Sequence, residues 1–528
     1  MITFNNNKIY TISKVTFITA AILGLSACNT TNSTTKNTTQ TNTDTTPEVY
    51  EANIASLQQY KTPQWFRDAK LGIYLHWGPY SVAEVGEWYP RKMYIQGTEE
   101  NKHHVKNYGH PSEFGYKDLI PLWKAEKFDP DALVGLFKQA GAKYFTPVAV
   151  HHDNFDLWDS KHQEWNSVNH GPKKDITGMW RDATLKHGLR FGVTTHLSRS
   201  YSWLNTSKLA DAKGEKAGVP YDGNDKNFSG LYHEQHSDTH PRAPLNPPKA
   251  WRDHWSARMK DLIDKYQPDH FYFDSAIPFR GEDNGQTGMD VIAHLYNTSL
   301  KKYDGEQQAV MAIKERPWQA MYDDGMATLD YERGKASHIL SEPWQTDDSI
   351  GDWGYRKKAT YMETNLVIDK FIDIVSKNGN LLLNIPIKAD GTLDKRATQT
   401  LEEMGQWMSA NSEGIYGSRP WYLFGEGKVN EIDHKAQKSP YTSKDIRFTT
   451  KDGNLYAYAL AWPGAGKTLR IKNITKGNMR IGLVESVTML GSNAKIKWQS
   501  ASDGLEIIMP KKPASDFAHG FKITFKSR

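Results

Sequence analysis

The sequence has almost no cysteine and no block of like charge. Cys28 is the only cysteine among the 528 residues, so no disulfide bond can form within the chain. The 66 basic and 61 acidic residues are interspersed and leave a net charge of +5. Because nucleic-acid-binding surfaces concentrate positive charge, this distribution argues against nucleic acid as a partner.

Long apolar runs are equally scarce, and the one near the N-terminus is too short to span a bilayer comfortably. It covers residues 15–25 and ends in Leu25-Ser26-Ala27-Cys28. This layout is typical of a secretory signal, and its ending resembles the bacterial lipobox, in which the cysteine is lipidated. We expect residues 1–27 to be removed and Cys28 to anchor an exported protein to a bacterial membrane, in the periplasm or at the cell surface. The alternative is ordinary cleavage with a free cysteine, and the oligomeric state stays open.

The composition divides the remaining chain into three parts. Residues 28–47 are rich in Thr, Asn and Ser, which predicts a flexible tether. Residues 48–415 alternate helical patterns with apolar runs typical of buried parallel strands. Residues 416–528 contain short alternating stretches separated by turn residues, which predict an antiparallel β-sandwich.

The middle part predicts an α/β fold of the (β/α)8-like barrel type. The expected strands are 71–75, 144–150, 190–195, 269–274, 308–313, 338–342 and 380–384. No glycine-rich phosphate-binding motif follows the first of them, which disfavours a doubly wound sheet. A long segment, residues 199–250, follows the third strand and should lie over the barrel mouth.

Titratable residues stand at the ends of four of these strands, namely His76, His151 with His152, His196 and Asp274. Core packing does not require such residues there, because an apolar shell penalises a buried charge. In a barrel, the carboxyl ends of the strands meet on the face that carries catalytic groups. The sequence therefore predicts an active site at this face, with Asp274 as the carboxylate.

A metal site is the less favoured interpretation of these histidines. Neither a His-x-His pair nor a His-Glu-x-x-His helix occurs. In a regular strand, adjacent His151 and His152 would point to opposite sides. We therefore expect no metal and no cofactor, with imidazoles that bind sugar hydroxyls while two carboxylates perform the reaction.

Several longer motifs support this reading. They are residues 65–78 with 87–94, residues 142–144 with 151–153 and 165–175, residues 268–274, residues 344–346 with 351–355, and residues 380–384 with 390–391. In this order, over roughly residues 50 to 425, the chain closely resembles the α-L-fucosidases of glycoside hydrolase family 29.

The resemblance implies a retaining, exo-acting enzyme on a barrel with a C-terminal β-sandwich, and a fucose-containing oligosaccharide or polysaccharide as substrate. It places the nucleophile on Asp274 and the acid/base on Glu332, with Glu342 as second choice. The sugar-binding positions that it implies are His76, Glu87, Trp88, His151, His152, Tyr272 and Arg316.

The sequence also departs from the family pattern. Relatives usually show a Tyr-rich ending after the third strand, whereas Thr194-Thr195-His196 stands here. An α-L-galactosidase of the same family is therefore an alternative, since a pocket rejects one added hydroxyl only modestly. A catalytically silent glycan-binding lipoprotein is a second alternative, from another functional class.

Overall fold

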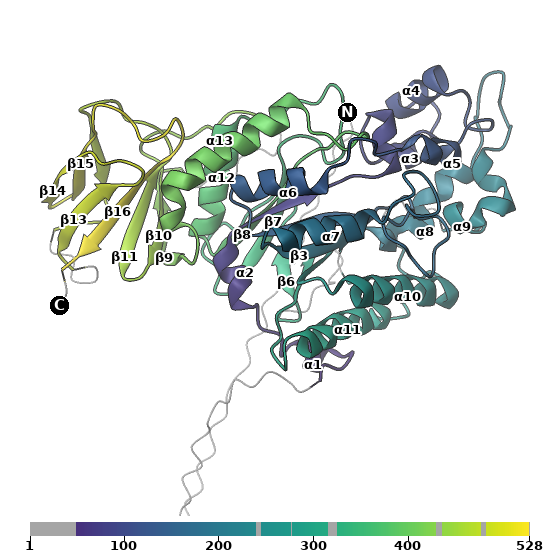
Figure 1. Cartoon of the computed structure of the whole chain (residues 1–528), viewed down its shortest axis with the longest axis horizontal. Helices are drawn as coiled ribbons and strands as arrows, with labels where there is room; N and C mark the ends of the chain where they lie inside the picture. The colour runs from purple at the N-terminus through teal and green to yellow at the C-terminus, as the bar shows by residue number, and fades with distance from the viewer. Residues whose placement is uncertain are drawn as a thin grey trace, which may run out of the picture. The chain divides into compact units, whose positions relative to one another are not determined.

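The computed structural model, which describes residues 49–238, 244–275, 277–314, 325–428, 436–476 and 482–526, contains a closed barrel of parallel strands in the order β1 to β8 (Figure 1). The strands are β1 (Leu71–Leu75), β2 (Tyr144–Val150), β3 (Arg190–Thr195), β4 (His270–Phe273), β5 (Val310–Lys314), β6 (Thr328–Asp330), β7 (Trp344–Ser349) and β8 (Gly379–Asn384). Strand β8 pairs with β1 and closes the barrel. The predicted barrel is confirmed.

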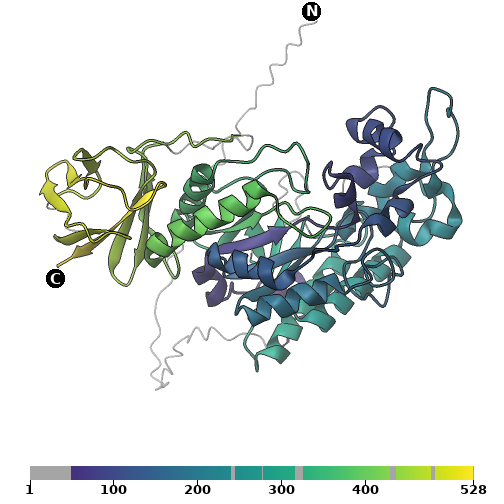
Figure 2. The ribbon, with the colours of Figure 1, turned by 45° about the horizontal axis from the view of Figure 1, so that its top comes forward.

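Helices cover the outside of the barrel. The longer ones are α6 (Pro130–Gln139), α7 (Ile176–Lys186), α10 (Lys249–Tyr266), α11 (Gln286–Lys302), α12 (Thr364–Ser376) and α13 (Lys395–Asn411). Helix α6 packs beside α7 and α10 beside α11, as both views show (Figures 1 and 2). Within the described ranges, none of the helices has the length and apolar character needed to cross a bilayer.

Local sequence determines where helix α10 gives way to strand β4. Gln267 adopts a left-handed conformation with φ of 46° directly after the helix, and Pro268 cannot continue the helical hydrogen bonds. The buried, apolar strand β4 follows at once. The turn therefore brings Asp274, the residue after β4, to the carboxyl end of the barrel.

The predicted strand at residues 338–342 is wrong. These residues form bends and irregular structure, and β7 begins only at Trp344, after Pro343. Proline has no N–H to donate to a strand ladder, which favours pairing from the next residue onward. Strand β7 was hard to foresee because Asp347 and Asp348, both buried, interrupt its apolar character.

The C-terminal part consists of antiparallel sheets. In the described residues, one sheet has the order β13-β16-β11-β10-β9 and the other the order β12-β15-β14. The strands are β9 (Arg419–Glu426), β10 (Ile446–Lys451), β11 (Asn454–Ala459), β12 (Thr468–Ile471), β13 (Val484–Met489), β14 (Lys497–Ala501), β15 (Gly504–Ile508) and β16 (His519–Phe525). Buried apolar side chains from both sheets form one core, which confirms the predicted β-sandwich.

The long segment after β3 is built from short helices, including α8 (Ser200–Trp203) and α9 (Ser229–Tyr232). Its buried Trp203 lies beside two residues of the predicted sugar site, with ring centroids 5.3 Å from His152 and 5.7 Å from Trp88. The segment therefore contacts the barrel mouth, as its position after β3 predicts.

Candidate active site

The predicted histidines come together at the carboxyl ends of β1, β2 and β3. The ring centroid of His151 lies 4.4 Å from that of His152 and 4.7 Å from that of His196. The ring of His76 lies 5.1 Å from that of His196. All four are buried. We call His76, His151, His152 and His196 the histidine cluster.

His151 and His152 both belong to this cluster, because the regular strand that would point them to opposite sides does not extend to them. Strand β2 ends at Val150, and its pairing with β3 shifts register between Val148 and Val150. Because the strand is irregular and ends there, side-chain alternation does not extend to the two histidines.

Hydrogen bonds orient His76. The Nδ2 amide of Asn384 donates to the carbonyl of Trp353 and to Oγ of Ser349, each at 2.9 Å. Its Oδ1 atom therefore faces His76, whose Nδ1 lies 2.9 Å away and donates to it. The other ring nitrogen, Nε2, keeps its lone pair and lies 3.4 Å from the hydroxyl of Tyr74. Burial and the neighbouring His196 hold the pKa of His76 well below its usual range, so the ring stays neutral.

The rings of His151 and His152 are neutral for the same reason. Burial, together with neighbouring His152 and His196, lowers the pKa of His151 well below its usual range. Burial and Arg199 do so for His152, whose Nδ1 donates to the backbone carbonyl of His196 at 2.7 Å. Neutral imidazoles both donate and accept hydrogen bonds, as recognition of sugar hydroxyls requires.

Such rings are also possible metal ligands. Two groups of three residues each bring one possible ligand atom per residue within 4.8 Å of the others. The groups are His76, His151 and His196, and His152, His196 and Asp274. Three neutral imidazoles form a donor set that zinc or copper accepts. The expectation of metal-free chemistry therefore stays a prediction.

Asp274 directly follows β4 and is 7% exposed. Its Oδ2 atom is 2.8 Å from Nδ1 of His196, and its Oδ1 atom contacts Nζ of Lys314. Although burial opposes ionisation, His196 and Lys314 hold the pKa of Asp274 well below its usual range. Asp274 is therefore ionised at neutral pH, as a carboxylate nucleophile must be.

Lys314, the last residue of β5, links Asp274 to further carboxylates. Its Nζ atom lies 3.0 Å from Glu332 and 3.7 Å from Asp347. Glu332 follows β6, and its side chain is 37% exposed. Glu342, in contrast, is exposed in the turn before β7. The structure thus brings Glu332 to Asp274 and leaves Glu342 outside this group of contacts.

Two buried aspartates, Asp330 and Asp347, act on the ammonium group of Lys314. Tyr272 donates its hydroxyl to Oδ2 of Asp330 at 2.9 Å, and Gln345 donates to Oδ1 at 2.9 Å. Burial raises the pKa of Asp330 to about 6, against the effect of Lys314. Burial and Asp330 raise the pKa of Asp347 well above its usual range. The hydroxyl of Tyr272 is therefore bound to Asp330, and its role in sugar binding stays a prediction.

Of the remaining predicted sugar-binding residues, the structure describes Glu87 and Trp88 but not Arg316. Glu87 is 9% exposed and accepts from the backbone N–H of Gly354 at 2.9 Å, and burial raises its pKa. The ring of Trp88 lies 5.9 Å from that of His152. Arg316 and Cys28 lie outside the residues that the structure describes.

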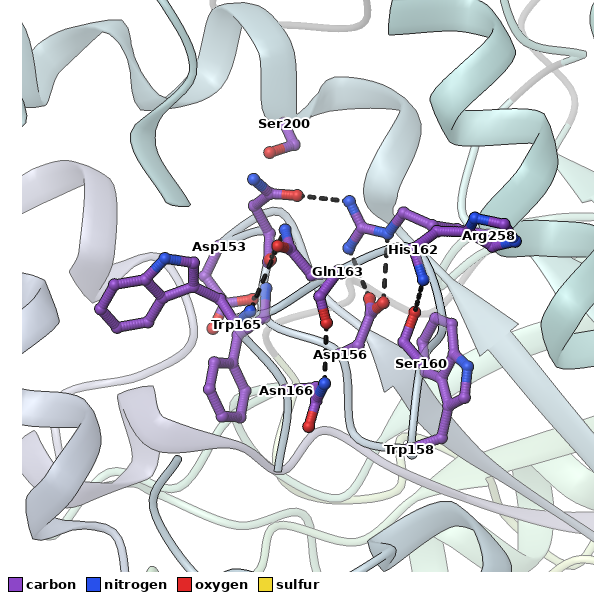
Figure 3. A network of polar contacts seen from close by, with 12 residues as sticks. Asp153, Asp156, Trp158, Ser160, His162, Gln163, Trp165, Asn166, Ser200 and Arg258 are labelled. Carbon is purple, nitrogen blue, oxygen red and sulfur yellow. Dashed lines mark hydrogen bonds and ion pairs between the residues drawn. The ribbon is translucent and has the colours of Figure 1, made fainter. Parts of the chain in front are cut away.

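A buried ion pair supports the loop that carries His151 and His152. Arg258, on α10, is fully buried and pairs with Asp156, and its Nη1 donates to Oδ1 of Asn154 at 2.6 Å (Figure 3). Trp158 donates to Asp261 of the same helix at 3.0 Å. These contacts fix the loop directly after the two histidines, which limits their movement.

Sequence reasoning missed Lys314, Asp330, Asp347, Asn384 and Tyr74. Lys314 could have been found from its position at a strand end. It is the last residue of β5, and His196 and Asp274 directly follow their strands. The expected strand stopped one residue earlier, at Ile313. The aspartates gave no separate signal, since a polar residue within a strand is usually assigned to the exposed face.

Known proteins match this chain over most of its length. The sequence matches the family model of α-L-fucosidase over residues 37–413 and that of the α-L-fucosidase C-terminal domain over residues 437–526. It is 28% identical to the tissue α-L-fucosidase of Rattus norvegicus over 487 residues, which cover 89% of this chain and 91% of the relative. The human tissue enzyme is 27% identical over 492 residues, covering 90% and 92%. The solved α-fucosidase of Thermotoga maritima has a TM-score of 0.69 at 26% identity, over 90% of this chain and 100% of that one.

Proposed function

The chain belongs to the α-L-fucosidase family, and on that premise we propose that it is a retaining, exo-acting α-L-fucosidase with Asp274 as nucleophile and Glu332 as acid/base. It is a glycoside hydrolase. The observation that carries the residue assignment is the contact of both carboxylates with Nζ of Lys314.

This contact limits how far apart the two carboxylates lie. Nζ is 3.0 Å from Glu332 and closer still to Asp274. Their nearest oxygens are therefore separated by less than about 6 Å. Retaining enzymes have a spacing of about 5–5.5 Å, whereas inverting enzymes need about 6.5–9.5 Å to admit a water. The spacing supports double displacement.

The proposed reaction has two displacement steps. An oxygen of ionised Asp274 attacks the anomeric carbon, the glycosidic C–O bond breaks, and its electron pair leaves with the oxygen, which takes the proton of Glu332. Water then attacks the anomeric carbon, gives a proton to Glu332 and releases Asp274. Neutral His76, His151 and His152 hold the sugar hydroxyls through hydrogen bonds.

The leaving glycan has room beside the site. A hollow of about 590 Å³ is lined by Arg333, which follows Glu332 directly, and by Trp353. The ring centroid of Trp353 lies 5.2 Å from that of His76, so this residue borders both the histidine cluster and the hollow. This supports action on fucose linked to a larger glycan, as in an oligosaccharide or polysaccharide.

Hydrolysis of a nitrophenyl α-L-fucoside, followed by NMR of the first sugar released, tests this function. We expect α-L-fucose to form first and then mutarotate. Initial release of the β-anomer would exclude the retaining mechanism. The matching nitrophenyl α-L-galactoside decides between the two sugars, and faster hydrolysis of the galactoside would establish the α-L-galactosidase alternative.

We also propose that Cys28 is lipidated and anchors the enzyme to a bacterial membrane. The support is the short apolar run that ends in Leu25-Ser26-Ala27-Cys28. Labelling of cells with a fatty-acid analogue should mark the wild-type protein and not the Cys28→Ser variant. Equal labelling of both would refute the anchor.

A further inference from the structure

Lys314 contacts both carboxylates that the proposed reaction uses. It is 3% exposed, and its backbone N–H donates to the carbonyl of Ser275 at 3.1 Å, next to the nucleophile Asp274. The β5–β6 register pairs Lys314 with Asp330, two residues before Glu332. The two strand ends thus hold its Nζ between Asp274 and Glu332.

The reaction moves one negative charge from the first carboxylate to the second. In the free enzyme Asp274 is ionised and Glu332 carries the proton that it will donate. In the glycosyl-enzyme Asp274 is an ester without charge and Glu332 is ionised. The charge that disappears at Asp274 therefore reappears at Glu332, and Lys314 lies at both ends of this transfer.

Building on the proposed function, we propose that Lys314 is a positioning residue that follows this charge, pairing with Asp274 in the free enzyme and with Glu332 in the glycosyl-enzyme. It keeps all its protons throughout, and only the partner of its ammonium group changes. Although burial opposes the charged form, Asp274, Asp347 and Glu332 raise the pKa of Lys314. A cation that favours the ionised form of each carboxylate in turn stabilises both states without giving up a proton itself.

Other charged groups face these carboxylates and share in their titration. Asp347 lies 3.7 Å from Nζ on β7, and Asp330 on β6 acts on the same ammonium group. His196 and Arg199, after β3, both act on Asp274. The centroid of the Tyr272 ring on β4 lies 5.9 Å from Nζ. The apparent pKa values that a pH profile gives therefore describe these coupled groups together and not one residue. A variant must be compared with wild type under one set of conditions.

The first experiment measures the pH profile of kcat/KM on a fucosylated oligosaccharide, whose leaving oxygen needs the proton of Glu332, for wild type, Lys314→Met and Lys314→Arg. A nearby cation lowers the pKa of a carboxyl group, so its removal raises the pKa of both Asp274 and Glu332. The acid limb reports ionisation of the nucleophile, and the alkaline limb reports loss of the proton from the acid/base. Both limbs should move to higher pH in Lys314→Met, by about one unit or more. They should stay in place in Lys314→Arg, which keeps the charge.

Lys370→Met is the matched control. Lys370 is also a buried lysine, and it pairs with Asp348, the neighbour of Asp347 on β7. Its removal should lower stability while both limbs stay in place. If Lys314→Met lowers activity but its limbs coincide with those of wild type, Lys314 has a merely structural role and the proposal fails.

A second experiment needs no variant and applies even if Lys314→Met does not fold. Wild-type enzyme is trapped as its glycosyl-enzyme with a fluorinated fucoside, and its crystal structure is solved. Nζ of Lys314 should lie within hydrogen-bond distance of Glu332 and farther from Asp274 than in the free enzyme. If Nζ stays on Asp274 and leaves Glu332, the proposal is wrong. If no covalent adduct with Asp274 forms, the proposed nucleophile is at fault instead.

Discussion

A buried ion cluster at the barrel mouth can be compared with another where the barrel meets the C-terminal sheets. In the mouth cluster, the ammonium group of Lys314 faces the carboxylates of Asp274, Glu332, Asp347 and Asp330, and Arg199 also acts on Asp274. In the junction cluster the ratio is reversed. The carboxylate of Asp373, on α12, accepts from Lys335 and Lys377 at 2.8 Å each and pairs with Arg447 on β10.

We infer from the difference in charge ratio that the mouth cluster serves the reaction, whereas the junction cluster stabilises the fold. Arg447 also donates to the backbone carbonyls of Glu426 and Lys428, at 3.2 and 2.7 Å, so its charge is satisfied on several sides. Although burial opposes ionisation, Arg447, Lys335 and Lys377 lower the pKa of Asp373. A buried acid with surplus cations keeps one protonation state, whereas the carboxylates around Lys314 differ in protonation, because the pKa of Asp274 is lowered and those of Asp330 and Asp347 are raised.

Replacing the nucleophile should have the largest effect. Asp274→Ala is expected to lower kcat at least about a thousandfold, because no covalent intermediate can form. Azide should partly restore turnover, since a small anion fits the space left beside Lys314 and His196. The measurement is hydrolysis of a nitrophenyl α-L-fucoside with and without azide. Full activity of Asp274→Ala would refute the assignment.

Replacing the acid/base should have an effect that depends on the leaving group. Glu332→Ala is expected to lower kcat/KM about 10²–10⁴-fold on natural fucosides, which need a proton on the departing oxygen. Nitrophenyl fucosides leave without that proton and should lose much less. Glu342→Ala is the matched control, because Glu342 is exposed outside the mouth cluster. Equal losses on both substrates in Glu332→Ala, or the leaving-group pattern in Glu342→Ala, would move the role to Glu342.

Much of the fold was predictable because most barrel strands are continuous apolar runs. Strands β6 and β7 were not, since β6 has only three residues and β7 reads Trp-Gln-Thr-Asp-Asp-Ser. The polarity of β7 has a physical reason that appears only in the fold. Asp347 faces Lys314 of the mouth cluster, and Asp348 pairs with Lys370 of α12.

The two ion clusters were predictable to different degrees. Asp274 and the histidines could be placed because each stands at the end of a predicted strand, and strand ends converge in any barrel. The contact of Lys314 with Glu332 depends on the β5–β6 register, which periodicity does not reveal. Asp373 and Arg447 are 74 residues apart, in elements of different kinds. No local pattern pairs them.

Removing the carboxylate of the junction cluster should affect stability rather than chemistry. Asp373→Asn leaves three buried or nearly buried cations without their counterion, and it is expected to cost about 3–5 kcal/mol in the free energy of unfolding at pH 7. The limbs of the pH profile of kcat/KM should stay in place, in contrast to Lys314→Met. Denaturant unfolding and the pH profile check the two parts. A shifted limb would show that the two clusters are not separate in function.

The stabilisation by Asp373 should disappear in acid. Because its pKa is lower in the folded than in the unfolded chain, its contribution is fully present above the unfolded value of about 3.9 and is lost as the pH falls through the folded value. The difference in unfolding free energy between wild type and Asp373→Asn should therefore stay constant from pH 7 to about 5 and shrink below about 4. Asp131→Asn is the control, since Asp131 pairs with Lys186 and His187 on the surface, where ion pairs contribute little. A difference for Asp373→Asn that is unchanged at low pH would mean that its carboxylate stabilises the junction by packing rather than by charge.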